Sequence, residues 1–150
     1  MKKIIKVLIT FIFLTGCGYT PIYSNKNFDF RLKNVTLAKS SKINSKVEKR
    51  LQNFSNQKSR KIISLKVDAQ KQINIIAKDS RGDPSRYEMI ISIKLETEYD
   101  QNQGASQFFE ERFNYNTNSN KFDLSQYEKV VEDLLINKNM DRIIYYLSGI

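Results

Sequence analysis

The chain has 150 residues and a formal net charge of +9, with 25 Lys or Arg, 16 Asp or Glu, one Cys and no His or Trp. The commonest general base and the usual zinc ligand sets are therefore missing. There is no glycine-rich phosphate loop, and the adjacent acids at Glu110-Glu111 and Glu132-Asp133 diverge on a strand or a helix. We therefore expect no catalytic residues, no cofactor and no bound metal, and we do not expect an enzyme.

Residues 1–16 have the composition of an export signal. Three lysines precede the apolar run Val7–Leu14, and small residues follow it. This order is typical of a secretory signal peptide. The apolar run is too short for a membrane-spanning helix, which needs about 20 apolar residues.

The single cysteine, Cys17, directly follows Leu14-Thr15-Gly16, and this order resembles the lipoprotein box of bacteria. The resemblance implies that the Cys17 thiol is diacylated, that the bond after Gly16 is cut, and that the new terminal amine is acylated. Two or more acyl chains anchor a protein stably where one does not. We therefore predict Cys17 to be a lipid attachment site; the alternative is an ordinary signal peptide with an incidental cysteine. Asp directly after the lipidated cysteine retains bacterial lipoproteins in the inner membrane, and this chain has Gly18 at that position. We therefore expect the protein to be located in the cell outer membrane.

Positive charge is concentrated in the first half of the mature chain. Residues 25–66 contain 12 Lys or Arg against two acids, whereas residues 67–150 contain 10 against 14. This asymmetry predicts an anionic partner. On an exported lipoprotein we expect that partner to be lipid phosphate, and we expect no nucleic-acid binding. The alternative is a solvated, lysine-rich face without a specific partner.

We expect residues 17–27 to form a lipidated extended linker and residues 28–150 to form a single domain. Alternating apolar residues from Phe28 to Leu37 predict a first strand with a bulge near Asn34.

The period becomes helical between Ser41 and Phe54. Four apolar residues share one face of this segment, namely Ile43, Val47, Leu51 and Phe54. Either Ser41 or Ser45 is placed to cap the helix. We expect this helix to pack on a sheet; the alternative is a basic amphipathic helix that lies on a membrane.

Alternating apolar residues return in three later segments, at residues 63–77, 86–99 and 109–115. The first segment predicts one long strand or two in succession. The second has apolar residues on one face and charged residues on the other, which indicates a sheet covered on one side. Polar turns at residues 79–85 and 100–106 separate the three segments, and such short connections predict antiparallel pairing.

An Asn-rich loop over residues 114–121 leads to a long final helix. Asp123 with Gln126, or Ser125 with Glu128, is expected to form a capping box. The apolar stripe of this helix consists of Leu124, Tyr127, Val131, Leu134, Leu135, Met140, Ile143, Ile144 and Leu147. The element order predicts an α+β two-layer sandwich: a mostly antiparallel sheet of four or five strands, with both helices packed on one face.

Four short motifs occur in order along nearly the whole mature chain: Gly16–Tyr23, Gly82–Met89, Tyr115-Asn116 and Ser125–Tyr127. With them the chain resembles the LptE family, the small outer-membrane lipoprotein of lipopolysaccharide assembly. The resemblance implies a domain that sits as a plug in a large LptD-type β-barrel translocon, faces the periplasm or the barrel lumen, and assists lipopolysaccharide assembly. The alternatives are a periplasm-facing lipoprotein that binds or scaffolds another envelope component, and a lipid carrier with an internal cavity.

Three basic residues, Lys78, Arg81 and Arg86, flank the Gly82-Asp83-Pro84 turn. Since a hairpin tip reaches away from the packed helices, these cations are candidate contacts for the phosphates of lipopolysaccharide, which guanidinium and ammonium groups bind through charge-assisted hydrogen bonds. The alternative is that acidic residues in the turn neutralise the tip locally.

Overall fold

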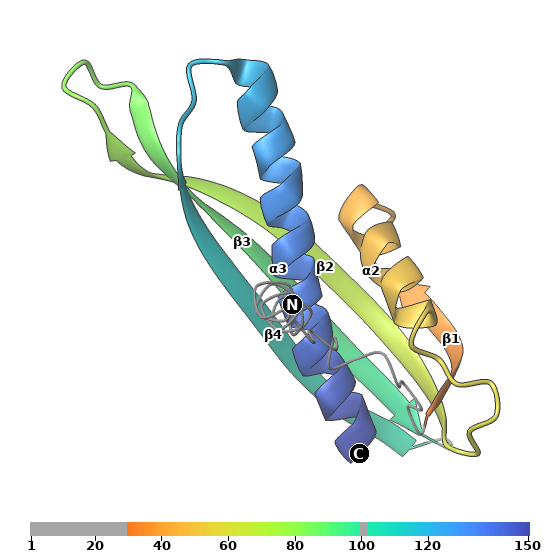
Figure 1. Ribbon diagram of the computed structural model, residues 1–150. Helices are drawn as coiled ribbons and strands as arrows, with labels where there is room; N and C mark the ends of the chain where they lie inside the picture. Colours follow the sequence, from red (N-terminus) through yellow and green to blue (C-terminus); the bar gives the residue numbers. More distant parts are fainter. Residues whose placement is uncertain (1–29, 100–101) are drawn as a thin grey trace, which may run out of the picture.

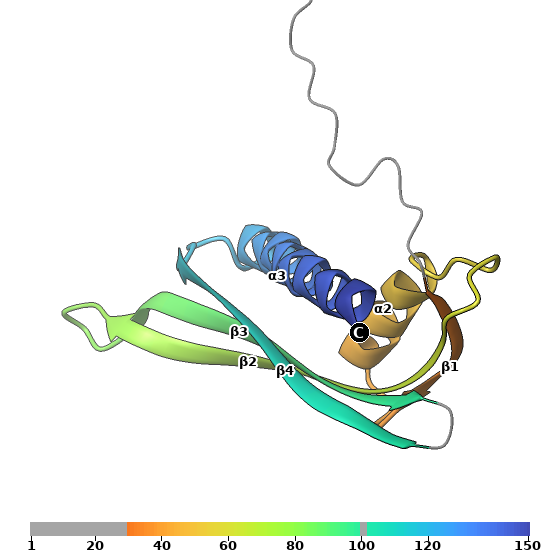
Figure 2. The same cartoon turned by 90° about the horizontal axis from the view of Figure 1, so that it is seen from below.

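The computed structural model describes residues 30–99 and 102–150, so Cys17, the predicted signal peptide and the linker lie outside the described residues. The elements in chain order are β1 (Arg31–Leu37), α2 (Lys42–Gln52), β2 (Ile62–Lys78), β3 (Pro84–Tyr99), β4 (Asn102–Asn116) and α3 (Lys121–Gly149). Both helices lie on the same face of one sheet, and the other face is open (Figures 1 and 2). The predicted two-layer α+β sandwich is confirmed.

The sheet has four strands in the order β1-β2-β3-β4. β1 and β2 are parallel, and α2 forms the crossover between them, whereas β2, β3 and β4 follow one another as antiparallel hairpins. A parallel pair requires such a crossover, since a tight turn cannot join two strands that run the same way. The expected bulge in β1 is present as a register shift between Leu32 and Asn34.

The predicted polar turn at residues 100–106 is wrong in extent, because β4 already begins at Asn102. Gly104 lies within this strand, beside the register shift between Glu96 and Glu98 of β3. A Cβ atom on Gly104 would lie 1.5 Å from the carbonyl oxygen of Thr97. Glycine here permits a close backbone approach inside the sheet. From the sequence alone, this strand glycine could not be distinguished from a turn glycine.

The core lies between the sheet and the two helices. In the row of β3 that was predicted to face one way, the residues Met89, Ile91, Ile93, Leu95 and Thr97 are buried and Tyr87 is partly buried. Val47 and Leu51 of α2 are buried as well. The fully buried side chains of the sheet include Ile63, Leu65, Met89, Ile91, Ile93 and Leu95. The opposite face of β3 is polar, so the prediction of a sheet covered on one side is confirmed.

The N-cap of α3 is Asn120, and neither predicted capping box forms it. The Oδ1 atom of Asn120 accepts hydrogen bonds from the backbone amides of Phe122 and Asp123, at 3.0 and 3.4 Å. The helix therefore begins at Lys121, earlier than either box would place it. Most of the predicted stripe is buried, but Tyr127 and Leu134 are exposed.

Candidate functional site at the distal hairpin

The long strand β2 has two halves with different surroundings. Its proximal half, residues 62–69, pairs with β1 and lies against α2, whereas its distal half, residues 70–78, has neither neighbour. The last β1 pair joins Leu37 to Val67. On its other edge β2 stays paired with β3 as far as Lys78. The distal half is therefore an edge strand without helical cover.

The buried side chain of Asn44, in the first turn of α2, marks the boundary between the two halves. Its Oδ1 atom accepts a hydrogen bond from the backbone amide of Ala69 at 2.6 Å, and its Nδ2 atom donates to the carbonyl of Lys39 at 2.9 Å. Since β1 has already ended, Asn44 pairs an amide of β2 that would otherwise be buried without an acceptor. The predicted cap of α2 by Ser41 is confirmed, with the Asn44 amide donating to its Oγ atom at 3.2 Å.

Beyond Ala69 the apolar alternation of β2 continues, but its side chains are not buried. Ile73 and Ile75 belong to the helix-facing row and are 39% and 51% exposed, and Ile76 on the strand is 43% exposed. These side chains are exposed because α2 begins level with Ala69 and does not extend over the distal half of β2. The distal half therefore presents apolar side chains to solvent.

The predicted turn between β2 and β3 is present and closely hydrogen-bonded. One oxygen of Asp79, Oδ1, accepts from the backbone amides of Arg81 and Asp83, both at 2.9 Å, and the Asp79 amide donates to the Asp83 carbonyl at 2.8 Å. Gly82 has a φ of 88°, a left-handed conformation that glycine adopts without strain. The turn thus has a defined shape at the far end of the hairpin (Figure 1).

The structure places all three predicted contact residues, Lys78, Arg81 and Arg86, at this distal end of the hairpin. A guanidinium nitrogen of Arg81 lies 3.6 Å from Asp79, yet the Arg81 side chain is 81% exposed. Arg86 donates from Nε to Asn116 at 3.4 Å. Within residues 30–99 and 102–150, neither Lys78 nor Arg86 forms an ion pair, so local neutralisation accounts for only one of the three cations.

A tyrosine cluster fixes α3 to the base of this hairpin. Tyr115 of β4 stacks on Tyr87 with 5.6 Å between ring centroids and meets Tyr127 edge-on at 6.0 Å. The Tyr115 hydroxyl donates to Glu128 at 2.8 Å. Burial, together with this carboxylate acceptor, raises the pKa of Tyr115 above its ordinary value. Tyr127 was predicted as part of the buried stripe of the helix, but it is exposed and packs against the Tyr115 ring.

An ion-pair network joins the two helices and the distal half of β2. Glu132 of α3 accepts from Lys46 of α2 at 2.5 Å and from Lys71 of β2 at 2.7 Å, and Arg50 lies 2.7 Å from Asp133. Burial alone would raise the pKa of Glu132, but the hydrogen bonds from Lys46 and Lys71 lower it below its ordinary value. Part of the positive charge in residues 25–66 is therefore balanced inside the domain. Sequence analysis missed this pairing because the partners are far apart in the chain.

Three further lysines border an open groove of about 730 Å³ near the start of α2. Lys39, Lys42 and Lys129 line this groove, and none of them forms an ion pair within the described part of the chain. The groove adds a second cationic surface beside the distal half of β2. The sequence indicated it only as a general excess of lysine.

The open face of the sheet is polar and largely self-neutralised. Glu96 lies 3.2 Å from Lys66 and 2.8 Å from Lys94, and Glu110 lies 2.5 Å from Arg112. Hydrogen bonds from Lys94 and Lys66 lower the pKa of Glu96. This face thus combines high polarity with a low net charge.

The fold is that of several solved bacterial lipoproteins. The chain is similar to rare lipoprotein B from Shewanella oneidensis, with 16% identity, a TM-score of 0.56, and coverage of 77% of this chain and 94% of that one. It is also similar to a minor lipoprotein from Acinetobacter baumannii, with 12% identity, a TM-score of 0.59, and coverage of 81% and 92%. A lipoprotein B from Nitrosomonas europaea gives 10% identity, a TM-score of 0.57, and coverage of 81% and 86%.

No family model and no curated protein matches the sequence. Neither helix formed by residues 30–99 and 102–150 is long and apolar enough to cross a membrane. At identities of 16% and below the similarity is one of fold, and the chain has the two-layer architecture of lipoproteins of the rare lipoprotein B type.

Proposed function

We propose that this chain is an outer-membrane lipoprotein that sits as a plug in an LptD-type β-barrel and assists the assembly of lipopolysaccharide at the outer-membrane surface. One combination of features carries the proposal. The domain has the fold of rare lipoprotein B structures, and in the sequence it follows Cys17, the cysteine of a lipoprotein box. The motifs that resemble the LptE family support the same assignment.

The open face of the sheet supports the plug role on physical grounds. The interior of a large barrel is polar and hydrated, and a plug must meet it without burying unpaired charge. The ion pairs of Glu96 and Glu110 leave this face polar while keeping these two carboxylates paired. Phe108, which is 60% exposed, gives it one large apolar contact.

The distal hairpin supports a role in handling lipopolysaccharide. Lys78, Arg81 and Arg86 supply donors for phosphate groups, and Ile75 and Ile76 lie exposed on the same hairpin. A phosphorylated lipid offers phosphate groups to the cationic side chains and acyl chains to the isoleucines.

Gentle solubilisation of membranes that contain the tagged, lipidated chain tests the plug role. We expect a stoichiometric complex with one large outer-membrane barrel, stable to mild detergent and salt, because an enclosed plug buries more surface than a rim contact. A photoreactive phenylalanine analogue at position 108 should cross-link to the barrel, whereas the same analogue at the buried position 109 should not. Recovery of the chain as a free species, or with a different envelope component, would contradict the proposal.

A further inference from the structure

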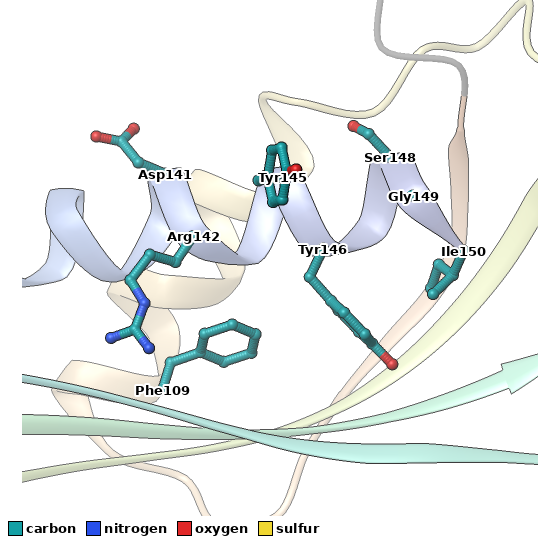
Figure 3. Close-up of a pocket in the computed structure, with 8 residues that line it drawn as sticks. All are labelled: Phe109, Asp141, Arg142, Tyr145, Tyr146, Ser148, Gly149 and Ile150. Carbon is teal, nitrogen blue, oxygen red and sulfur yellow. The ribbon is translucent and has the colours of Figure 1, made fainter.

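The C-terminal end of α3 carries an open apolar groove that the proposed function does not use. The groove measures about 810 Å³ and is lined by Phe109 of β4 and by the last turns of α3. Arg142 and Tyr146 point from the helix toward β4, where the guanidinium carbon of Arg142 lies 5.7 Å from the centre of the Phe109 ring (Figure 3). The rings of Phe109 and Tyr146 lie 6.1 Å apart.

Two large apolar side chains at this groove are exposed. Tyr145 is 85% exposed and Ile150 is 37% exposed, and a Cβ atom on Gly149 would have nothing within 4 Å. Arg142, one of the two charged residues that line the groove, already has partners, since it donates to Glu111 at 3.0 Å and to the Glu110 carbonyl at 3.1 Å. The other charged residue, Asp141, points away from Phe109 and Tyr146 (Figure 3), so the surface beside these two rings is aromatic, which favours an apolar occupant.

The described chain starts close to this groove. The amide of Arg31 donates to the carbonyl of Lys61 at 2.7 Å, and the Lys61 ammonium lies 3.4 Å from the carbonyl of Leu147. The first described residues of the chain therefore lie near the last turn of α3. An extended chain covers at most about 3.6 Å per residue, so Tyr23 can reach about 25 Å from Phe30 and Tyr19 about 40 Å.

We propose that the segment Tyr19–Tyr23 of the same chain docks in this groove. Its sequence, Tyr-Thr-Pro-Ile-Tyr, has three large apolar or aromatic side chains and no charge. It thus matches the groove in chemistry and lies within reach of it.

The docked segment would fix the domain relative to its membrane anchor. Tyr19 is only two residues from Cys17, so docking would hold the anchor at the C-terminal end of α3. A helix of 29 residues is about 43 Å long, and the distal hairpin lies toward its opposite end (Figure 1). The hairpin tip would then point away from the anchored end of the domain. The docking itself does not depend on the proposed partner or on lipopolysaccharide.

Photocross-linking in the full, lipidated chain tests the docking. A photoreactive phenylalanine analogue replaces Tyr145, and the matched control carries it at Phe122, which is also aromatic, exposed and on α3. The two positions are 23 residues apart along α3, or about 34 Å. We expect cross-links from position 145 to residues 18–26 of the same chain and none from position 122. Mixing isotopically labelled and unlabelled chains separates links within a chain from links between copies.

Tryptic cleavage after Lys26 gives a second measurement. If Tyr145 holds the segment, Tyr145→Ser should make this cleavage roughly two to ten times faster than in the wild type, the range expected for one aromatic contact. Phe122→Ser should leave the rate unchanged. Equal rates in all three chains, or cross-links from position 145 that occur only between copies or only to another protein, would overturn the proposal.

Discussion

The two halves of β2 share one sequence pattern but have different environments. In the proximal half, Ile63, Leu65 and Val67 are almost completely buried, while in the distal half Ile73 and Ile75 retain two-fifths to one-half of their exposure. The alternation is the same, and the difference is the cover that α2 provides. A periodic apolar row therefore identifies the face of a strand but not the length over which that face is packed.

The stability of the domain should also depend differently on the two halves, because only the proximal half has β1 as a second neighbouring strand and α2 as cover. Both halves are paired with β3, from Ser64 to Lys78, with register shifts near Ala77. Only the proximal half is covered by α2. The stability of the domain should therefore depend on the proximal half, which leaves the distal half free to make contacts outside the domain.

The largest expected effect comes from comparing a buried isoleucine of β3, which pairs with Ala69 of the proximal half, with an exposed isoleucine of the distal half. Ile93→Ala removes atoms from a side chain with no exposure, whereas Ile75→Ala removes the same atoms from a side chain that is 51% exposed. We expect Ile93→Ala to lower the free energy of unfolding by about 2–5 kcal/mol, the usual cost of a buried truncation, and Ile75→Ala to lower it by less than about 1 kcal/mol. Urea denaturation followed by circular dichroism measures both. Similar losses would mean that the distal half is packed after all.

A smaller effect is expected at the ion pairs that link the distal half of β2 and α2 to α3. Glu132→Gln removes the charge that pairs with both Lys46 and Lys71. We expect a loss of about 1 kcal/mol at pH 7, because the two lysines are partly exposed and solvent screens them. Glu96→Gln, on the solvated open face, is the control and should change stability little. An equal loss in the two variants would argue against a special role for Glu132.

The pH dependence of that difference follows from the direction of the pKa shift. The pKa of Glu132 is lowered in the folded state, so its contribution is fully present above the unfolded value of about 4.3 and is lost as the pH falls through the folded pKa. The pKa of Lys46 is raised by Glu132, so its contribution is present below the unfolded value and is lost as the pH rises through the folded pKa. The wild type should therefore exceed Glu132→Gln in stability at pH 7 and lose the difference in strong acid. A constant difference down to pH 2 would contradict the pairing.

Local chemistry made much of this fold predictable. The strict alternation of β3 identified its buried face, and the Asp79–Pro84 composition identified the turn, because both depend on neighbouring residues in the chain. The start of α3 was harder, since Asn120, Asp123 and Ser125 all suit an N-cap and only the observed hydrogen bonds to Asn120 separate them.

The features that sequence analysis missed depend on contacts between distant segments. The exposure of Ile75 follows from where α2 begins in space, and the pairing of Lys46 with Glu132 joins residues 86 positions apart. For the candidate site, the turn pattern placed Arg81 and Arg86 correctly on a hairpin, but no pattern indicated that the hairpin would extend beyond the cover of α2. Their contact with lipid stays a prediction.

Reversing the exposed charges of the distal hairpin should have almost no effect on the stability of the domain. The double substitution Arg81→Glu with Arg86→Glu reverses two exposed charges of the distal hairpin that make few contacts within the domain. Lys58→Glu with Arg60→Glu is the matched control, because it makes the same charge change at exposed positions in the loop between α2 and β2. Both variants should fold normally and, if the proposed barrel complex forms, associate with it as the wild type does.

The two variants should differ in lipid binding. We expect the hairpin variant to bind phosphorylated lipid A roughly ten times more weakly than the wild type, because a carboxylate then faces phosphate where a guanidinium stood. Binding of a dephosphorylated analogue should change little, since charge-assisted hydrogen bonds to phosphate are absent there in both chains. The loop control should bind both lipids as the wild type does, which separates a local contact from the effect of net charge. Equal weakening in the two variants would indicate general electrostatic attraction, and equal binding of both lipids by all chains would remove phosphate recognition from the hairpin.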